Sequence, residues 1–167
     1  MAIKNFWSLQ AGEAIISDLI KKKLSKCYQI FFPVNNQLKN LDLILINLKT
    51  KKIVTIQIKE SREFNEGTGN GWFIVNRDKV KNKVVDFYIF VVYATIQTAH
   101  KIKIQVRTLI IPSEDLMLKS KNKRLISNKN YYYFFRIQGN KAYDDREKGK
   151  EPEDYSEYVD NFKLLEI

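Results

Sequence analysis

Two apolar stretches joined by a short polar segment form the clearest pattern in this chain. Residues 41–46 and 53–59 have the aliphatic and β-branched character of strands, and residues 47–52 between them form a polar turn. This pattern predicts an antiparallel β-hairpin.

The hairpin brings three polar side chains to one place. If its turn is centred between Lys49 and Thr50, Asp42 lies opposite Gln57, because the two residues are equally far from that centre. Side chains alternate along a strand, so Gln57 and Lys59 leave from the same face. A carboxylate, an amide and an ammonium group therefore converge. An amphipathic strand with a solvated polar face would give the same pattern, so both interpretations stay open at this point.

Apolar residues recur at helical spacing over residues 11–24, which predicts an amphipathic helix. Glu13 lies three residues before Ile16 and seven before Ile20, so it points with the apolar stripe. A buried carboxylate loses hydration worth on the order of several kcal/mol unless a cation or donor compensates. A divalent metal between Glu13 and Asp42 would do so. Alternatively, Glu13 occupies the first helical turn, where the helix dipole favours an acid by about 0.3 to 1 kcal/mol, and reaches water.

The rest of the chain predicts further strands and short helices. The last helix, over residues 153–165, carries an apolar stripe that includes Tyr155, Tyr158 and Phe162. The other predicted strands are residues 28–34, 72–75, 87–93, 103–111 and 131–135, and the other predicted helices are residues 77–84 and a helix capped by Ser113.

An aromatic run marks the strand at residues 131–135. Alternation places Tyr132 and Phe134 on one face of this strand and the other three aromatic residues on the opposite face. Aromatic side chains can stack on unpaired bases, but packing in the core is expected on at least one of the two faces.

The charge of the chain suits a polyanionic partner. The formal net charge is +10 and the isoelectric point is near 9.5. Residues 1–143 carry 25 Lys and Arg against 10 Asp and Glu, whereas residues 144–167 carry 4 against 9. The acidic tail could fold back onto the basic body and compete with DNA, or form a polar helix end. The candidate phosphate contacts are Lys21–Lys23, Lys49 with Lys51 and Lys52, Lys79–Lys83 and Lys119–Arg124.

Length and composition restrict the class of protein. The 167 residues contain no Gly/Pro/Ser linker, so we expect one domain with a core over about residues 10–93 and a C-terminal extension over about 100–167. Cys27 and His100 are the single cysteine and histidine, which excludes an intramolecular disulfide, a Cys-based zinc cluster and a site with several histidines. No stretch approaches 18 apolar residues, so we expect a soluble, cytoplasmic protein without membrane contact.

The order of these features resembles the PD-(D/E)xK nuclease superfamily, which includes restriction endonucleases and Holliday-junction resolvases. In that family a helix bearing a Glu precedes a hairpin that bears an Asp and then an acid or Gln, any residue, and Lys. Here Glu13 stands in the helix, Asp42 begins the first arm, and Gln57-Ile58-Lys59 ends the second. The resemblance implies an α/β fold with a restriction-endonuclease-like core, in which helices flank a central mixed β-sheet.

The resemblance also implies a catalytic role for each motif residue. Glu13, Asp42, Gln57 and the backbone carbonyl of Ile58 would hold Mg²⁺, with Mn²⁺ as a substitute, and Lys59 would position the attacking water. Gln57 departs from the more common acid, because its amide oxygen can bind the ion but brings no charge. Glu60 is a rival ligand, although strand parity sends it to the opposite face.

The resemblance therefore predicts a metal-dependent endonuclease that hydrolyses phosphodiester bonds in DNA, and analogy with the family implies a homodimer. Two alternatives come from other classes of protein. The first is a catalytically inactive nucleic-acid-binding protein that kept the nuclease fold, with Gln57 as the mark of lost activity. The second is a basic partner-binding protein with no nucleic-acid role.

Overall fold

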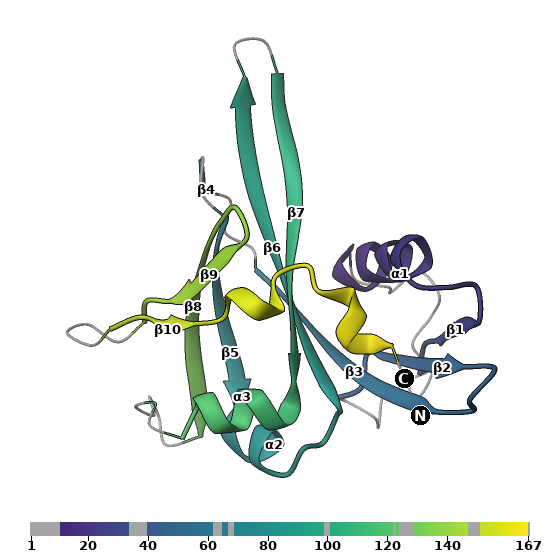
Figure 1. Ribbon diagram of the computed structural model, residues 1–167. Coiled ribbons are helices and arrows are strands. Elements are labelled where there is room, and N and C mark those ends of the chain that lie inside the picture. The colour runs from purple at the N-terminus through teal and green to yellow at the C-terminus, as the bar shows by residue number, and fades with distance from the viewer. Residues whose placement is uncertain are drawn as a thin grey trace, which may run out of the picture.

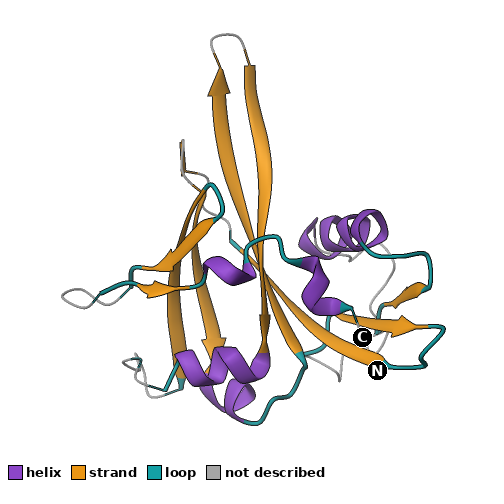
Figure 2. Ribbon diagram, viewed as in Figure 1, coloured by secondary structure: helices purple, strands orange, loops and turns teal. Residues whose placement is uncertain are grey.

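The fold is known here from a computed structural model, which describes residues 11–33, 40–61, 65–66, 69–98, 101–121, 123, 129–146 and 151–166. Two β-sheets pack against each other, and one helix covers the free face of the larger sheet (Figures 1 and 2). Within the described residues, no helix is long and apolar enough to span a bilayer.

The larger sheet has six strands among the described residues. Strand β3 pairs in parallel with β6, and the short β4 also runs parallel to β6, while the remaining pairs are antiparallel. The order is β1-β2-β3-β6-β4, and β7 pairs with the other edge of β6. The strands are β1 (Tyr28–Phe31), β2 (Leu43–Asn47), β3 (Ile53–Glu60), β4 (Asn65–Glu66), β6 (Phe87–Thr98) and β7 (Lys101–Pro112).

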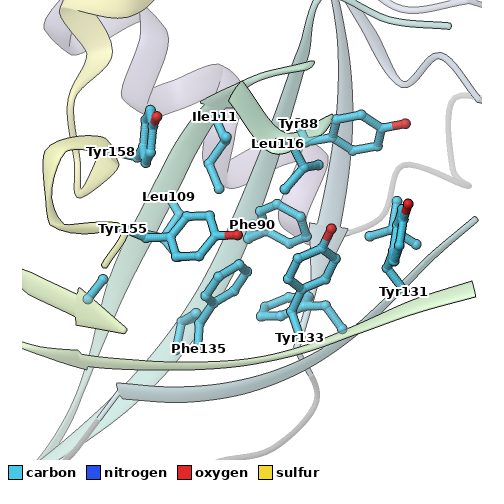
Figure 3. Close-up of a cluster of buried hydrophobic side chains, with 14 of the residues drawn as sticks. Tyr88, Phe90, Leu109, Ile111, Leu116, Tyr131, Tyr133, Phe135, Tyr155 and Tyr158 are labelled. Atoms are coloured by element: carbon cyan, nitrogen blue, oxygen red, sulfur yellow. The ribbon is translucent and has the colours of Figure 1, made fainter. Parts of the chain in front are cut away.

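The smaller sheet is antiparallel throughout, with the order β10-β9-β8-β5. Its inner face presents Tyr131, Tyr133 and Phe135 to Phe90 of the larger sheet, and Figure 3 shows these rings gathered in one cluster. Phe90 and Phe135 meet edge to face with ring centroids 5.0 Å apart, a favourable aromatic geometry. The strands are β5 (Gly69–Asn76), β8 (Asn130–Gln138), β9 (Lys141–Asp144) and β10 (Glu153–Asp154).

Helix α1 (Ala11–Lys23) covers the other face of the larger sheet. Its Ile16 and Ile20 pack against a core that includes Leu43 and Ile56, and all four side chains are at most 1% exposed. Burial of each such side chain stabilises the fold by about 1.5 to 3 kcal/mol. The apolar spacing in the sequence therefore predicted this helix and its buried face correctly.

These findings confirm an α/β fold with a central mixed sheet, but of the expected flanking helices only α1 packs across a face of that sheet. The second face of the larger sheet is covered by the smaller sheet instead. The alternating aromatic residues of β8 explain this result. They give that strand one buried aromatic face, which packs against the larger sheet where a helix would otherwise lie. The short helices α2 (Arg77–Lys81) and α3 (Ser113–Lys119) lie at one end of this second layer (Figure 1). Ser113 does not cap α3, since its hydroxyl donates to the Val85 carbonyl.

The C-terminal segment buries the predicted side chains without forming the predicted helix. Tyr155, Tyr158 and Phe162 are all buried, but the backbone forms β10 followed by two 3₁₀ turns, η2 (Ser156–Tyr158) and η3 (Phe162–Leu165). The interruption falls at Asp160, which has a φ of 49°. Its carboxylate accepts hydrogen bonds from the Thr108 N–H at 2.8 Å and the Thr108 hydroxyl at 2.9 Å, and these bonds compete with a continuous helix.

We expect Asp160→Ala to lower the free energy of unfolding by about 2 to 4 kcal/mol, because it leaves the N–H of fully buried Thr108 without an acceptor and removes the ion pair with Arg107. Urea unfolding followed by circular dichroism measures the change. Glu166→Ala, an exposed acid on the same segment, is the matched control. A loss equal to that of the control would show that Asp160 does not hold the segment in place.

The buried tyrosines predict that the fold is lost at alkaline pH. Burial raises the pKa of Tyr88 to about 12 and raises the pKa of Tyr133 and Tyr155 above the usual value of 10. Below pH 10 these hydroxyls are protonated in both states, so their contribution to stability is fully present. Between pH 10 and 12 the unfolded chain releases protons that the folded chain retains, and stability falls. Circular dichroism and tyrosinate absorbance, titrated together, should change in one cooperative step; independent, gradual ionisation would contradict this expectation.

Candidate metal centre at the end of the hairpin

The hairpin has the register that the sequence predicted. Leu43 pairs with Ile56 and Ile46 with Ile53, which centres the turn between residues 49 and 50. Asn47 stabilises the turn, because its side-chain oxygen accepts from the N–H groups of Lys49 and Thr50 at 3.0 and 3.2 Å. This local capping is what fixes the register on which the site depends.

Asp42 lies at the open end of this hairpin, beside Gln57. Its N–H donates to the Ile56 carbonyl at 3.0 Å, and its Oδ2 accepts from the Ile58 N–H at 2.7 Å. The Asp42 carboxylate thus accepts from the Ile58 N–H, which would otherwise donate to a backbone carbonyl if β2 were longer. The N–H and C=O of one strand residue point to the same neighbouring strand, so the Ile58 carbonyl is directed toward the Asp42 side as well.

Gln57 and Lys59 share one face of β3, as strand parity predicted. Gln57 pairs with Tyr88 and Lys59 with Phe90 along β6, and both partners belong to the core between the two sheets. Gln57 is only 5% exposed. Burial lowers the pKa of Lys59, although the nearby Asp42 carboxylate opposes that shift and Lys79 adds to it. Lys59 therefore lies within the field of Asp42, in a partly dehydrated position.

Glu13 approaches the same end of β3 from the opposite face. Its side chain is 3% exposed, so the expectation that it points with the apolar stripe is correct and the water-exposed alternative is wrong. The neighbouring Gly12 N–H donates to Glu60 Oε2 at 3.1 Å, which anchors the first turn of α1 beside the last residue of β3. The structure thus brings Asp42, Gln57 and Lys59 together, and it places the Glu13 helix across the strand from Gln57 and Lys59.

Glu60 has a structural role that separates it from the candidate ligands. One of its oxygens accepts from Gly12, and the other accepts from the Tyr93 hydroxyl. Burial and this hydrogen bond raise the pKa of Tyr93. Glu60 lies on the α1 face, as strand parity predicted, and its oxygens connect α1, β3 and β6.

The oxygen donors at this place would bind a hard divalent cation only if carboxylate, amide and backbone carbonyl oxygens act together. Among the described residues there is no group of three or more His, Cys, Asp or Glu that could hold a metal ion. A site here therefore needs the Gln57 amide oxygen and the Ile58 carbonyl in addition to the Asp42 carboxylate. Mg²⁺ accepts such ligands and usually keeps several waters. The donor types fit the ion, and the orientation of the Ile58 carbonyl toward Asp42 agrees with that fit.

Lys79 and Asn40 also belong to this neighbourhood, although the sequence did not place them there. Lys79, on α2, donates to the Asn40 side-chain oxygen and depresses the pKa of Lys59. In the sequence, Lys79 belongs only to the basic run Lys79–Lys83. The Asn76 side chain accepts from the N–H groups of Asp78 and Lys79 and so fixes where this helix begins, but no local pattern places the helix beside Lys59.

The acidic C-terminal segment neutralises part of the basic body. Its acids form ion pairs with cations of the preceding chain, and these acids reduce the charge available to a polyanion on that side of the molecule. The pairs are Asp144 with Lys123, Asp145 with Arg136, Glu153 with Lys119, and Asp160 with Arg107. The lysines of the hairpin turn, Lys49, Lys51 and Lys52, are exposed.

Comparison with known proteins gives no family for this chain: no family model matches it, and neither the curated proteins nor the solved structures include a match.

We expect Lys59→Met to raise the stability of the fold, because burial makes the ammonium form of Lys59 costly. The cost is fully present below the lowered pKa of Lys59 and disappears as pH rises toward 10.5, where the unfolded chain also loses its proton. Urea midpoints at neutral pH and near pH 10 measure both effects. The exposed Lys163→Met serves as control. A midpoint that falls at neutral pH would mean that the attraction to Asp42 outweighs the burial cost.

Proposed function

We propose that this protein is a Mg²⁺-dependent endonuclease that hydrolyses phosphodiester bonds in DNA. The proposal rests above all on the hydrogen bond from the Ile58 N–H to Asp42, which joins the aspartate to the middle of the Gln57-Ile58-Lys59 motif. Asp42, Gln57 and the Ile58 carbonyl would hold the ion, whereas Glu13 belongs to the helix on the other face of β3 and is left out of this set. The ion, when bound, supplies Lewis-acid activation of a water and offsets charge in the transition state.

The residues of the chain have separate parts in this reaction. Asp42 fixes the end of β3 through its bond to Ile58 and so orients the carbonyl of that residue. Lys59 donates hydrogen bonds to the attacking water and to the developing charge on phosphate, and its partial burial strengthens both interactions. Hydrolysis forms one bond from the water oxygen to phosphorus and breaks one phosphodiester P–O bond. Lys79 adds positive charge at the same place.

DNA is the proposed substrate because the formal charge of the chain is +10 and the turn of the catalytic hairpin carries three exposed lysines. By family analogy, two copies of the chain would cut the two strands of a duplex. One feature favours the competing function of binding without cleavage, which is the neutral and nearly buried Gln57.

Supercoiled plasmid incubated with the protein and Mg²⁺ tests the proposal. We expect nicked or linear product from the native protein, no product with EDTA, and a loss of at least about 100-fold in rate for Asp42→Asn and for Lys59→Met. Asn keeps an acceptor for the Ile58 N–H, so Asp42→Asn removes the charge with little effect on the fold. The matched controls are Asp78→Asn and Lys163→Met, which change an exposed acid and an exposed lysine elsewhere.

Two results would overturn the enzyme assignment. The first is salt-sensitive DNA binding without cleavage in Mg²⁺ or Mn²⁺, which would support the inactive binding protein. The second is cleavage that survives both site substitutions, which would place the activity elsewhere or in a contaminant. Absence of DNA binding at low salt would leave only a basic partner-binding protein.

A further inference from the structure

The outer face of the smaller sheet carries exposed aromatic and apolar side chains. Along β8 the residues that alternate with buried Tyr131, Tyr133 and Phe135 are Tyr132 and Phe134, and both are only partly buried. Trp72 and Ile74 on neighbouring β5 are 43% and 55% exposed. These positions lie on the face opposite the core that Figure 3 shows. A soluble protein that leaves large apolar side chains together on one surface commonly uses them for binding.

Three aromatic side chains and one isoleucine form one continuous surface across β5 and β8. Trp72 pairs with Phe134 and Ile74 with Tyr132, so the four side chains adjoin. The rings of Trp72 and Phe134 have centroids 4.5 Å apart with an interplanar angle of 41°. We name this surface the aromatic platform: Trp72, Ile74, Tyr132 and Phe134.

Two arginines adjoin the aromatic platform. The Arg146 guanidinium lies 5.2 Å from the centroid of the Trp72 ring, which is a cation–π geometry. Its Nε is buried and lacks a hydrogen-bond partner among the described residues. Arg136, 40% exposed, pairs with Asp145 at 2.7 Å. The Arg146 guanidinium thus adds positive charge beside the Trp72 ring, where it would attract the phosphate of a ligand stacked there.

We infer that the aromatic platform binds single-stranded nucleic acid by stacking unpaired bases on Trp72 and Phe134, while Arg146 donates to a phosphate or base oxygen. Every base has a face that stacks on an aromatic ring, and four-stranded sheets with exposed aromatic residues are one established way of binding unpaired bases. A purely apolar protein partner fits less well, because it would cover the guanidinium charge of Arg146 without supplying an anion. This inference does not depend on the metal centre, which lies on a different sheet.

Fluorescence anisotropy in EDTA tests the inference, because the metal centre then takes no part in it. The probes are labelled oligo-dT and oligo-U, an abasic oligonucleotide of the same length and charge, and a duplex of the same length. We expect both single-stranded homopolymers to bind more tightly than the abasic and duplex probes. Trp72→Ala and Phe134→Ala should each weaken binding to the homopolymers by about 5- to 150-fold, which corresponds to one lost stacking contact of about 1 to 3 kcal/mol.

Matched variants separate stacking from damage to the fold. Trp72→Phe keeps a ring and should retain most of the affinity, and Leu118→Ala, on an apolar residue that is 47% exposed on α3, should leave it unchanged. Plasmid cleavage in Mg²⁺ reports on the nuclease proposal and anisotropy in EDTA reports on the platform, so failure of the nuclease proposal and failure of this inference give different results. The chain has two tryptophans. A Trp7→Phe variant leaves Trp72 as the only one, and its fluorescence should be quenched on addition of oligo-dT.

Three results would overturn the inference. One is equal affinity for abasic and base-containing strands, which would leave only phosphate attraction. Another is unchanged oligo-dT affinity in Trp72→Ala. The third is concentration-dependent self-association in sedimentation velocity that Trp72→Ala abolishes, without any strand binding, because the platform would then be an interface between copies of the chain. A difference between oligo-dT and oligo-U, by contrast, identifies which of the two nucleic acids the platform prefers.

Discussion

Burial of β6 on both faces is the constraint on which the rest of the structure depends. Tyr88 and Phe90 face the smaller sheet, and Ile89 and Val91 face α1, all with no exposed surface. A strand that is apolar on both faces must be central, and its two edges must be paired. The parallel pairing with β3 follows from this position, and it places the end of the hairpin against the body of the molecule.

The contact between β3 and β6 is reinforced where β6 begins. Asp86 Oδ2 accepts from the N–H and the hydroxyl of Thr55 at 2.8 and 2.7 Å, and the Asp86 N–H donates to the Thr55 carbonyl at 3.0 Å. These bonds align the two strands at the point where their buried, paired residues begin. Two independent groups of hydrogen bonds therefore fix the positions of Gln57 and Lys59: those of Asn47 in the hairpin turn and those between Asp86 and Thr55.

Local patterns predicted what local interactions determine. The helix over residues 11–24, the hairpin register and the burial of Glu13 follow from spacing and turn chemistry within short stretches of chain. The second sheet was missed because it joins β5 to β8, about 60 residues apart, through pairings that no periodicity reveals. Lys79 was missed as a neighbour of Lys59 for the same reason. Asp160 shows the converse, since its bonds to Thr108 override a helical pattern that the sequence does contain.

The adjacency of Lys59 and Glu60 makes the molecule intolerant of length changes in β3. The two residues have opposite charges and leave from opposite faces, with the acid bonded to the start of α1 and the lysine near Asp42. Deletion of one residue from this strand would exchange their places. An ammonium group would then meet the positive end of the helix, and a carboxylate would meet Asp42. An insertion or deletion in this segment would therefore disturb both faces of the sheet at once, whereas a substitution at one of the two positions disturbs only one face.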